Sequence, residues 1–474
     1  MLDLVIKNGK LVFDTSIVSA DIAVKGDKIW AIGYAQDFPE TVRVIDASGK
    51  YVMPGAIDAH MHVEAPFQGC LGANDFYTQS ISAAFGGVTM FMDFTNTFKG
   101  MSVLDAFEKR KEDMSKSAID YSIHGKFVEA PPERIAEIEG LVERGCPTFK
   151  LFMTYRREGV MATDETLMRV FERAKELSAL PMVHAESNVI AEYNLDRFVD
   201  SGKLDWHYFA AAKPVLCEAE AFSRALYLSQ VVGNALLIVH TTNGAALGVA
   251  EAAQKKGVPI YVETCPHYLF LFSDNYDLPD GHLYICSPPL RTEDEAESLW
   301  QGMRNGTVSV TGSDDCTYSR AEKEMFLEKG PDGKIIRDFR KVVNGVSGIE
   351  TRLPLLLSEG VNKGRLSINQ VCALVSSNIA KLYGCYPQKG VLAPGSDADI
   401  TIVDMEKTVT LSAGMLHNNV DYCLFDGMKI KGMPVMTISR GAIIIEDGKF
   451  HGKRGAGQFV HRKMDPQYTQ YFAL

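Results

Sequence analysis

The spacing of apolar and polar residues changes twice along the chain. Residues 1–53 contain short apolar runs separated by turn signals such as Asn8-Gly9 and Ser48-Gly49, a pattern typical of strands joined by hairpins. Such strands alone would leave edges and one face uncovered, so a partner sheet is expected elsewhere in the chain. The predicted strands cover Leu4–Ile6, Leu11–Phe13, Ile22–Val24, Ile29–Ala31 and Val42–Ile45.

From Pro54 onwards, continuous apolar runs alternate with amphipathic stretches of helical period. Buried strands that alternate with helices favour a parallel (β/α)8 TIM-like barrel, and a doubly wound open sheet is the alternative. The eight predicted strands are Ala56–His60, Val88–Asp93, Ile119–Lys126, Thr148–Phe152, Pro181–His184, Leu236–His240, Ile260–Thr264 and Val308–Asp314. The predicted helices include Pro132–Gly145, Asp164–Ala179, Glu218–Gly233, Gly244–Gly257 and Asp294–Gly306.

After the barrel pattern, two further helices are predicted over Ile349–Lys363 and Ser367–Tyr383, and strands then return. These late strands are expected over Asp399–Val403, Val420–Phe425, Lys429–Val435, Thr437–Ser439 and Ala442–Ile445. We expect the two strand-rich ends to meet in one smaller β-sandwich. The predicted domains are therefore 1–53 (sandwich, first part), 54–384 (barrel), 385–450 (sandwich, second part) and 451–474 (a tail that could contact a neighbouring subunit).

Composition narrows the possible functions. The 474 residues are 46% hydrophobic and 23% charged, which is typical of a globular protein with a large core. A net charge of −11 argues against nucleic acid as a partner, because phosphate binding needs basic patches. The nine cysteines are scattered without a Cys-x-x-Cys motif, and neither a signal peptide nor a membrane-length apolar run is present. These features predict reduced thiols, no membrane association and a cytoplasmic location.

Candidate metal ligands occur where the predicted barrel strands end. His60 and His62 are two residues apart, so on a strand both imidazoles point to the same side. This pair alone is weak evidence, but the carboxyl ends of barrel strands meet at one face. Three or four nitrogen and oxygen ligands at one point would suit zinc or another divalent metal. The other polar residues at strand ends are Lys150, His184, His240 and Asp314.

Each of these residues also has a simpler interpretation. His184 or His240, taken singly, could be a hydrogen-bonded core histidine, and His124, in the middle of a strand, is expected to pack. Asp314 could be a metal ligand that also accepts a proton, or it could cap a helix, a role that Asp315 could fill instead.

Lys150 allows two interpretations. A lysine at a strand end can extend its amine towards solvent. Burial can instead depress the pKa of the amine, and the neutral amine can react with carbon dioxide to give a carbamate, an anionic ligand able to bridge two metals.

The motifs in order resemble the hydantoinase/dihydropyrimidinase branch of the amidohydrolase superfamily, and most of all the bacterial hydantoinases. The resemblance runs from the N-terminus to about residue 460. It rests on the segments Pro54–His62, Phe149–Tyr155, Val183–Glu186, Ile238–His240, Cys265–Leu269, Ser287–Arg291, Gly312–Asp314, Asn344–Glu350 and Lys389–Asp399.

The resemblance implies a metal-dependent cyclic amidase with two zinc ions per chain, in a homotetramer or a homodimer. Carbamylated Lys150 (N6-carboxylysine) would bridge the two metals, which supply a hydroxide nucleophile at neutral pH. The same comparison implies that the substrate is a small cyclic amide or ureide, and that ring opening gives an N-carbamoyl amino acid. The implied ligands of one metal are His60, His62, Asp314 and Lys150, and those of the other are His184, His240 and Lys150.

Two catalytic and two substrate-binding roles are also implied by the resemblance. Asp314 would carry the proton from the nucleophile to the leaving nitrogen, and Tyr155 would donate a hydrogen bond to the developing oxyanion. Backbone groups near Ser287 and Asn344 would hold the amide face of the substrate. The loop Val63–Asn74, with Pro66, Phe67 and Leu71, is expected to cover the site.

Departures from the family pattern affect the pocket more than the ligands. Asp315 stands where relatives often carry histidine, and Arg156–Val160 replaces a usually bulky segment. The alternative functions are dihydropyrimidinase, allantoinase or dihydroorotase activity. A non-catalytic scaffold of the same fold is disfavoured, because all six ligand positions are present.

Overall fold

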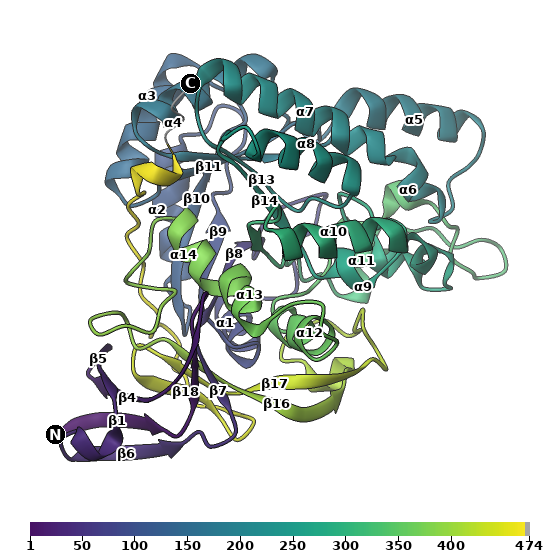
Figure 1. Cartoon of the computed structure of the whole chain (residues 1–474). Helices are drawn as coiled ribbons and strands as arrows, with labels where there is room; N and C mark the ends of the chain where they lie inside the picture. Colours follow the sequence, from purple (N-terminus) through teal and green to yellow (C-terminus); the bar gives the residue numbers. More distant parts are fainter. Residues whose placement is uncertain (470–474) are drawn as a thin grey trace.

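The computed structural model describes residues 1–469 and places an eight-stranded parallel barrel beside a two-sheet domain (Figure 1). The barrel strands are neighbours in chain order, which confirms the predicted barrel and excludes a doubly wound sheet, whose strand order reverses at a switch point. The barrel strands are β8 (Ala56–Met61), β9 (Val88–Phe94), β10 (Asp120–Lys126), β11 (Thr148–Phe152), β12 (Leu180–His184), β13 (Leu236–Ile238), β14 (Ile260–Thr264) and β15 (Val310–Thr311).

The sixth and eighth strands, β13 and β15, are shorter than predicted. They end at Ile238 and Thr311 rather than at His240 and Asp314. The φ angles of His240 (40°) and Asp314 (48°) lie in the left-handed region, which no strand residue adopts. Both residues therefore leave the strand direction where they enter the site.

Contacts between the first and last strands close the barrel. Met61 and Asp315 form a parallel bridge, and the N–H of His62 donates to the carbonyl of Asp315 at 2.8 Å. The guanidinium of Arg352 is fully buried and donates to the carbonyls of Ile57 and Thr311 at 2.6 and 2.5 Å. One buried cation thus links β8 to β15.

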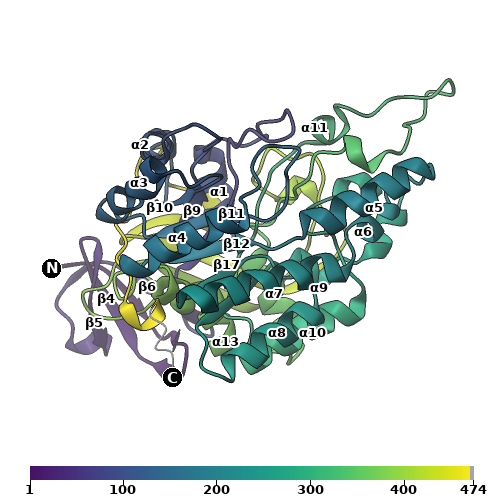
Figure 2. The same ribbon diagram turned by 90° about the horizontal axis from the view of Figure 1, so that it is seen from above.

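Helices surround the barrel, as the view from above shows (Figure 2). In α4, Leu167, Val170, Phe171 and Ala174 recur at helical spacing and are buried, and Thr163 caps the first turn. Each of the five predicted helices between strands is present. The helices are α1 (Phe76–Phe85), α2 (Val103–Met114), α3 (Pro132–Glu143), α4 (Asp164–Glu176), α5 (Asn188–Asp200), α6 (Tyr208–Ala212), α7 (Val215–Val232), α8 (Gly244–Gln254), α9 (His267–Phe270), α10 (Glu293–Asn305), α11 (Arg320–Glu324), α12 (Arg352–Leu355), α13 (Ile368–Cys372) and α14 (Asn378–Leu382). Among residues 1–469, no helix is both long and apolar enough to span a lipid bilayer.

The two ends of the chain meet in the second domain, as predicted. Strand β16 (Ile400–Thr410) pairs antiparallel with β7 (Tyr51–Pro54), which joins C-terminal to N-terminal sequence in one sheet. The seven-stranded sheet has the order β19 (Lys449–Phe450), β18 (Ala442–Glu446), β17 (Lys429–Ser439), β16, β7, β2 (Lys10–Val12) and β3 (Ile17–Ser19). The four-stranded sheet has the order β5 (Lys28–Gly33), β4 (Asp21–Lys25), β1 (Leu2–Lys7) and β6 (Thr41–Asp46).

Two details of the late strands differ from the prediction. Residues 420–425 form turns and no strand, although Val420 and Phe425 are buried, because their apolar side chains pack into the core from a loop. The runs predicted separately over 429–435 and 437–439 form the single strand β17. The exact domain boundaries stay a prediction.

Residues 451–469 pack along the base of this chain's own barrel. The N–H of Val460 donates to the carbonyl of Tyr121 at 2.8 Å. The buried guanidinium of Arg462 donates to the hydroxyl of Ser122 at 2.8 Å and to the carbonyl of Ile123 at 2.5 Å. Most of the predicted tail is therefore part of the barrel base, and its contact with another subunit stays a prediction. Residues 470–474 lie outside the described part of the chain.

A buried ion cluster links the barrel to the second domain. Lys389 Nζ lies 2.5 Å from Asp120 in β10, 2.6 Å from Asp399 and 2.9 Å from Asp397. Although burial alone would lower it, the three carboxylates raise the pKa of Lys389. Burial raises the pKa of Asp399 to about 6 despite the nearby ammonium.

We expect Lys389→Met to lower the free energy of unfolding by about 3–5 kcal/mol, because it leaves buried carboxylates without a counter-ion. Burial already holds the pKa of Asp399 above its unfolded value, and removing the ammonium would raise this pKa further; a group whose folded pKa is raised loses its stabilising contribution as pH rises. The loss should therefore be larger at pH 8 than at pH 5. Urea unfolding of parent and variant at both pH values measures it. The control is Lys109→Met, which removes an exposed lysine that also pairs with two carboxylates. An equal loss in both variants would contradict the prediction.

Candidate metal centre and active site

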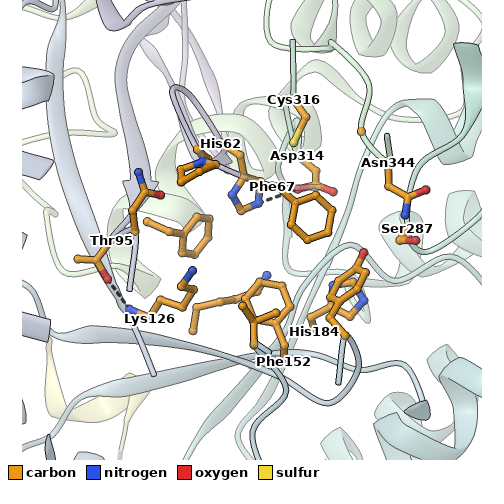
Figure 3. A pocket seen from close by; sticks show the side chains of 18 of the residues that line it. His62, Phe67, Thr95, Lys126, Phe152, His184, Ser287, Asp314, Cys316 and Asn344 are labelled. Atoms are coloured by element: carbon orange, nitrogen blue, oxygen red, sulfur yellow. Dashed lines mark hydrogen bonds and ion pairs between the residues drawn. The ribbon is translucent and has the colours of Figure 1, made fainter. Parts of the chain in front are cut away.

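A cavity of about 830 Å³, the solvent at its mouth included, opens at the carboxyl ends of the barrel strands (Figure 3). All but one of the sequence-predicted site residues line it. The exception is His60, which is buried beneath the cavity floor in contact with Asp314. The predicted residues that line the cavity are His62, Lys150, Tyr155, His184, His240, Ser287, Asp314 and Asn344.

The carboxylate of Asp314 lies between two histidines from β8 and the residue after it. Asp314 Oδ1 is 3.1 Å from His60 Nε2 and 3.3 Å from His62 Nε2. Burial by itself would raise the pKa of Asp314, but His60, His62 and Lys150 hold it well below its usual range. The group is therefore a carboxylate at neutral pH.

Lys150 in β11 is fully buried at the same point. Its Nζ lies 3.3 Å from His60 Nε2. Burial lowers the pKa of Lys150 to about 8, against the opposing effects of Asp314 and Glu263. The lowered pKa increases the fraction of neutral amine, which is the form that carbamate formation requires.

His184 and His240 form the other side of the cluster. Their ring centroids are 4.3 Å apart, and His240 lies 5.4 Å from the ring of His60. Burial lowers the pKa of His184 to about 4 and that of His240 well below its ordinary value, so both rings are neutral. Within residues 1–469, Nδ1 of His240 is buried and has no hydrogen-bond partner. A buried acceptor without a partner is a position that a cation would fill.

Two carboxylates that sequence analysis did not identify orient these histidines. Glu263 Oε1 in β14 lies 2.6 Å from His60 Nδ1, and Glu186 Oε2 lies 2.7 Å from His184 Nε2. Metal-binding histidines typically hold a carboxylate with the second ring nitrogen in this way. A glutamate inside the apolar run Ile260–Thr264 was the available signal for Glu263.

A missing side chain at Gly312 allows this packing. A Cβ at Gly312 would lie 2.8 Å from Glu263 Oε2 and 2.9 Å from the Cβ of His60. Any larger residue would therefore push apart the histidine and the glutamate that orients it.

Tyr155 lines the cavity next to His184. Its φ angle is 68°, its ring lies 5.4 Å from that of His184, and Lys213 Nζ lies 5.2 Å from the ring centroid. Burial, with Glu186 nearby, raises the pKa of Tyr155 well above its ordinary value, so the phenol stays protonated and can donate. Left-handed backbone at Tyr155, His240 and Asp314 fits the tendency of strained residues to occur at functional sites.

Ser287 and Asn344 form the wall next to Tyr155. The hydroxyl of Ser287 accepts a hydrogen bond from Lys213 Nζ at 2.8 Å. The backbone N–H of Asn344 donates to Gln68 Oε1 at 2.9 Å. The side-chain oxygen of Asn344, Oδ1, is buried and has no hydrogen-bond partner among the described residues. These contacts fix the backbone beside the cavity.

The loop 63–74 covers part of the site. Pro66 and Phe67 line the cavity, and the ring of Phe67 meets that of Tyr155 edge-on at 5.2 Å. Leu71 is not among the residues that line the cavity, and it is 52% exposed. The expectation for Leu71 was therefore wrong.

Asp315 and His124 have structural roles. The carboxylate of Asp315 accepts the N–H groups of Gly348 and Ile349 at 2.7 and 2.8 Å, and burial raises its pKa to about 6. His124 packs inside the barrel as predicted, bonded to Thr148 Oγ1 at 2.6 Å and to the carbonyl of Ala59 at 3.0 Å.

The donor set fits divalent metal ions. Four imidazoles, one carboxylate and one lysine converge, and His60, His240 and Asp314 each place a donor atom within 4.8 Å of the others. Nitrogen and oxygen donors of this kind suit zinc. Two such ions would share the lysine if it carried a carbamate.

Sequence and structure comparisons all find similarity to the same group of known proteins. Residues 51–444 match the model of the amidohydrolase family. The D-hydantoinase of Geobacillus stearothermophilus is 40% identical over 96% of both chains, and that of Ralstonia pickettii is 38% identical over 98% of this chain and 99% of the relative. The crystal structure of dihydropyrimidinase from Brevibacillus agri NCHU1002 superposes with a TM-score of 0.93 at 37% identity, over the full length of both chains.

Proposed function

The chain belongs to the amidohydrolase family and is a hydrolase of cyclic amides, and we propose that it opens 5-substituted hydantoins to N-carbamoyl amino acids. The observation that carries this proposal is the convergence of four histidines, Lys150 and Asp314 at one end of the barrel. Full-length similarity to D-hydantoinases supports the hydantoin ring as the proposed substrate.

Two divalent ions, of which zinc is the proposed identity, would be held by the residues that the sequence predicts. Bound there, such ions would polarise the amide carbonyl and supply a hydroxide nucleophile at neutral pH. Carbamylation of Lys150 is supported by its complete burial and its lowered pKa. One ion would be bound by His60, His62, Asp314 and Lys150, and the other by His184, His240 and Lys150.

Asp314 is the proposed proton carrier. Its Oδ1 is engaged by both imidazoles of β8, which leaves Oδ2 to take the proton of the nucleophile. The same oxygen then returns the proton to the ring nitrogen, which leaves as the C–N bond breaks. Its low pKa keeps the carboxylate ready to accept at neutral pH.

Tyr155 is the proposed oxyanion donor. Its phenol stays protonated and reaches the cavity beside His184, where the carbonyl oxygen gains charge. Ser287 and Asn344, on the adjacent wall, are proposed to hold the amide face of the ring through backbone groups. The ring is thereby fixed with its scissile bond over the metal site.

Dihydropyrimidinase activity is the nearest alternative, favoured by the similarity to the Brevibacillus agri structure. Allantoinase-type activity is a further candidate, because it opens a related ureide ring. A non-catalytic scaffold has no support in the site, since every proposed ligand is present and oriented towards the same point.

The experiment that tests the function measures ring opening of dihydrouracil and of D- and L-5-substituted hydantoins, with metal content determined on the same preparation. We expect about two zinc ions per chain and fastest turnover of an alkyl or aryl hydantoin. Preference for dihydrouracil would identify a dihydropyrimidinase. Two metals without turnover of either ring would contradict both assignments, and no metal even after supply of zinc and bicarbonate would favour the scaffold.

Location and assembly are part of the proposal. All nine cysteines are unpaired, and eight of them are buried, which supports the reducing conditions of the cytoplasm. A homotetramer or homodimer is proposed by analogy with the family, and light scattering of the purified protein measures it. No nucleic acid or membrane is proposed as a partner, and a small cyclic amide or ureide is the expected ligand.

A further inference from the structure

Lys126 places a cation in the cavity that the proposed mechanism does not use. It is the last residue of β10, and it follows Ser122 and His124 at two-residue spacing on the side that faces the barrel interior. At the carboxyl end of the strand this side opens into the cavity, and Figure 3 shows the side chain of Lys126 rising from the strand towards its centre.

The ammonium of Lys126 has no anionic partner in the described part of the chain. Its surroundings are the ring of Phe98, whose centroid lies 4.7 Å from Nζ, and the guanidinium of Arg110 farther away. Burial, and to a smaller extent Arg110, lowers the pKa of Lys126 to about 8, which leaves the amine mostly protonated at pH 7.

Two other lysines at the site, in contrast, have carboxylates beside them. Lys213 pairs with Glu186 at 3.0 Å, and Lys150 lies next to Asp314 and Glu263. A partly buried charge without a counter-ion is costly, and a ligand that supplies the counter-ion removes that cost. Lys126 therefore has the properties of a binding group rather than those of a structural one.

The position of Lys126 indicates which part of a ligand it would meet. In Figure 3, Thr95 and Lys126 lie on one side of the cavity, and Ser287 and Asn344 lie on the other. A ring held at the Ser287 and Asn344 wall would leave the Lys126 side of the cavity free for its substituent. Phe94, Phe98 and Phe152 also line the cavity, Phe98 directly beside Lys126 Nζ, and they would contact the stem of the substituent.

We propose that Lys126 is a specificity residue that selects cyclic amides whose ring substituent ends in a carboxylate. Its ammonium would pair with that carboxylate while the three phenylalanines cover the carbons in between. This inference rests on the proposed ring-opening function and names the substrate class for the same site.

The test uses two hydantoins of nearly equal size and shape, 5-(2-carboxyethyl)hydantoin and 5-(2-carbamoylethyl)hydantoin, with both enantiomers of each. They differ only in whether the substituent ends in a carboxylate or in a neutral amide. The readout is the ratio of the two kcat/KM values for the metal-loaded protein. We expect the parent to favour the carboxylate by roughly 10- to 100-fold, the size of a hydrogen bond to a charged group.

Three variants separate a binding role from a structural one. Lys126→Met keeps the length of the side chain and removes the charge, so the ratio should fall to about one. Lys126→Arg keeps the charge and should retain the preference. Lys109→Met, on the exposed face of α2, should keep the ratio of the parent. Thermal melting and metal content show whether each variant is folded and loaded.

Two results would separate failure of this inference from failure of the function. Turnover of both hydantoins with a parental ratio near one, or an unchanged ratio in Lys126→Met, would overturn the role of Lys126 and leave the hydantoinase assignment intact. Absence of turnover of any hydantoin by the metal-loaded parent would overturn the proposed function, and this inference with it. If Lys126→Met does not fold, the parental ratio and that of Lys126→Arg still decide the matter.

Discussion

Replacing His60 or Lys150 by alanine is expected to lower kcat/KM for ring opening at least about 10³-fold, because the hydroxide nucleophile is lost when water is no longer activated by metal. His60 approaches both Lys150 and Asp314 within 3.3 Å, so its loss would remove one proposed ligand and leave two others without a neighbour that positions them. Zinc per chain, measured by mass spectrometry, should fall together with activity.

The fold should survive both substitutions, because neither side chain fills the apolar core clusters of the barrel. Near-parental circular dichroism and thermal melting would confirm this. Lys109→Ala, an exposed lysine on α2, is the matched control for Lys150→Ala. Near-normal turnover of cyclic amides by either site variant would show that the metal-site assignment is wrong.

Tyr155→Phe is expected to lower kcat by about 10²- to 10³-fold with a small change in KM, which is the effect of removing one oxyanion donor. The phenol donates only to charge that develops in the transition state, so ground-state binding should change little. Because burial holds the pKa of Tyr155 far above neutrality, the pH profile of the parent should show no loss of activity from its ionisation below pH 9.

Tyr193→Phe, at an exposed position on α5, is the control for this substitution. This substitution also removes a tyrosine hydroxyl, but one that lies outside the cavity, so the variant should behave like the parent. An unchanged kcat with a raised KM in Tyr155→Phe would assign the tyrosine to substrate binding alone and contradict its role as oxyanion donor.

The sequence by itself determined the barrel and the second domain. Continuous apolar runs such as Pro181–His184 favour buried strands, and their alternation with helical patterns favours a parallel barrel. The Pro54–His62 segment led to the metal-site hypothesis, because strand ends converge at one face whatever the details of packing. Lys150 was assigned to that site only through the resemblance to a known family. The resemblance to a known family then assigned roles to Tyr155, Ser287 and Asn344.

Local pattern was insufficient where tertiary packing controls the backbone. The run 420–425 is apolar enough for a strand, yet it is buried as a loop because it packs into the core without a neighbouring strand. His240 and Asp314 lie beyond the ends of β13 and β15, because side-chain convergence requires left-handed backbone there. Spacing along the sequence contains no information on such turns.

Only the tertiary structure showed which residues complete the site. Glu263 orients His60 although the two residues are 203 positions apart in the sequence. Glu186 is only two positions from His184, but its contact with the ring became visible only in three dimensions. The sequence placed Lys126 at the end of a predicted strand and gave it no role. The proposed binding role follows from the absence of a carboxylate beside its ammonium in the described part of the chain. A charge is identified as a binding group by the absence of a counter-ion in three dimensions, and that absence depends on how distant segments pack.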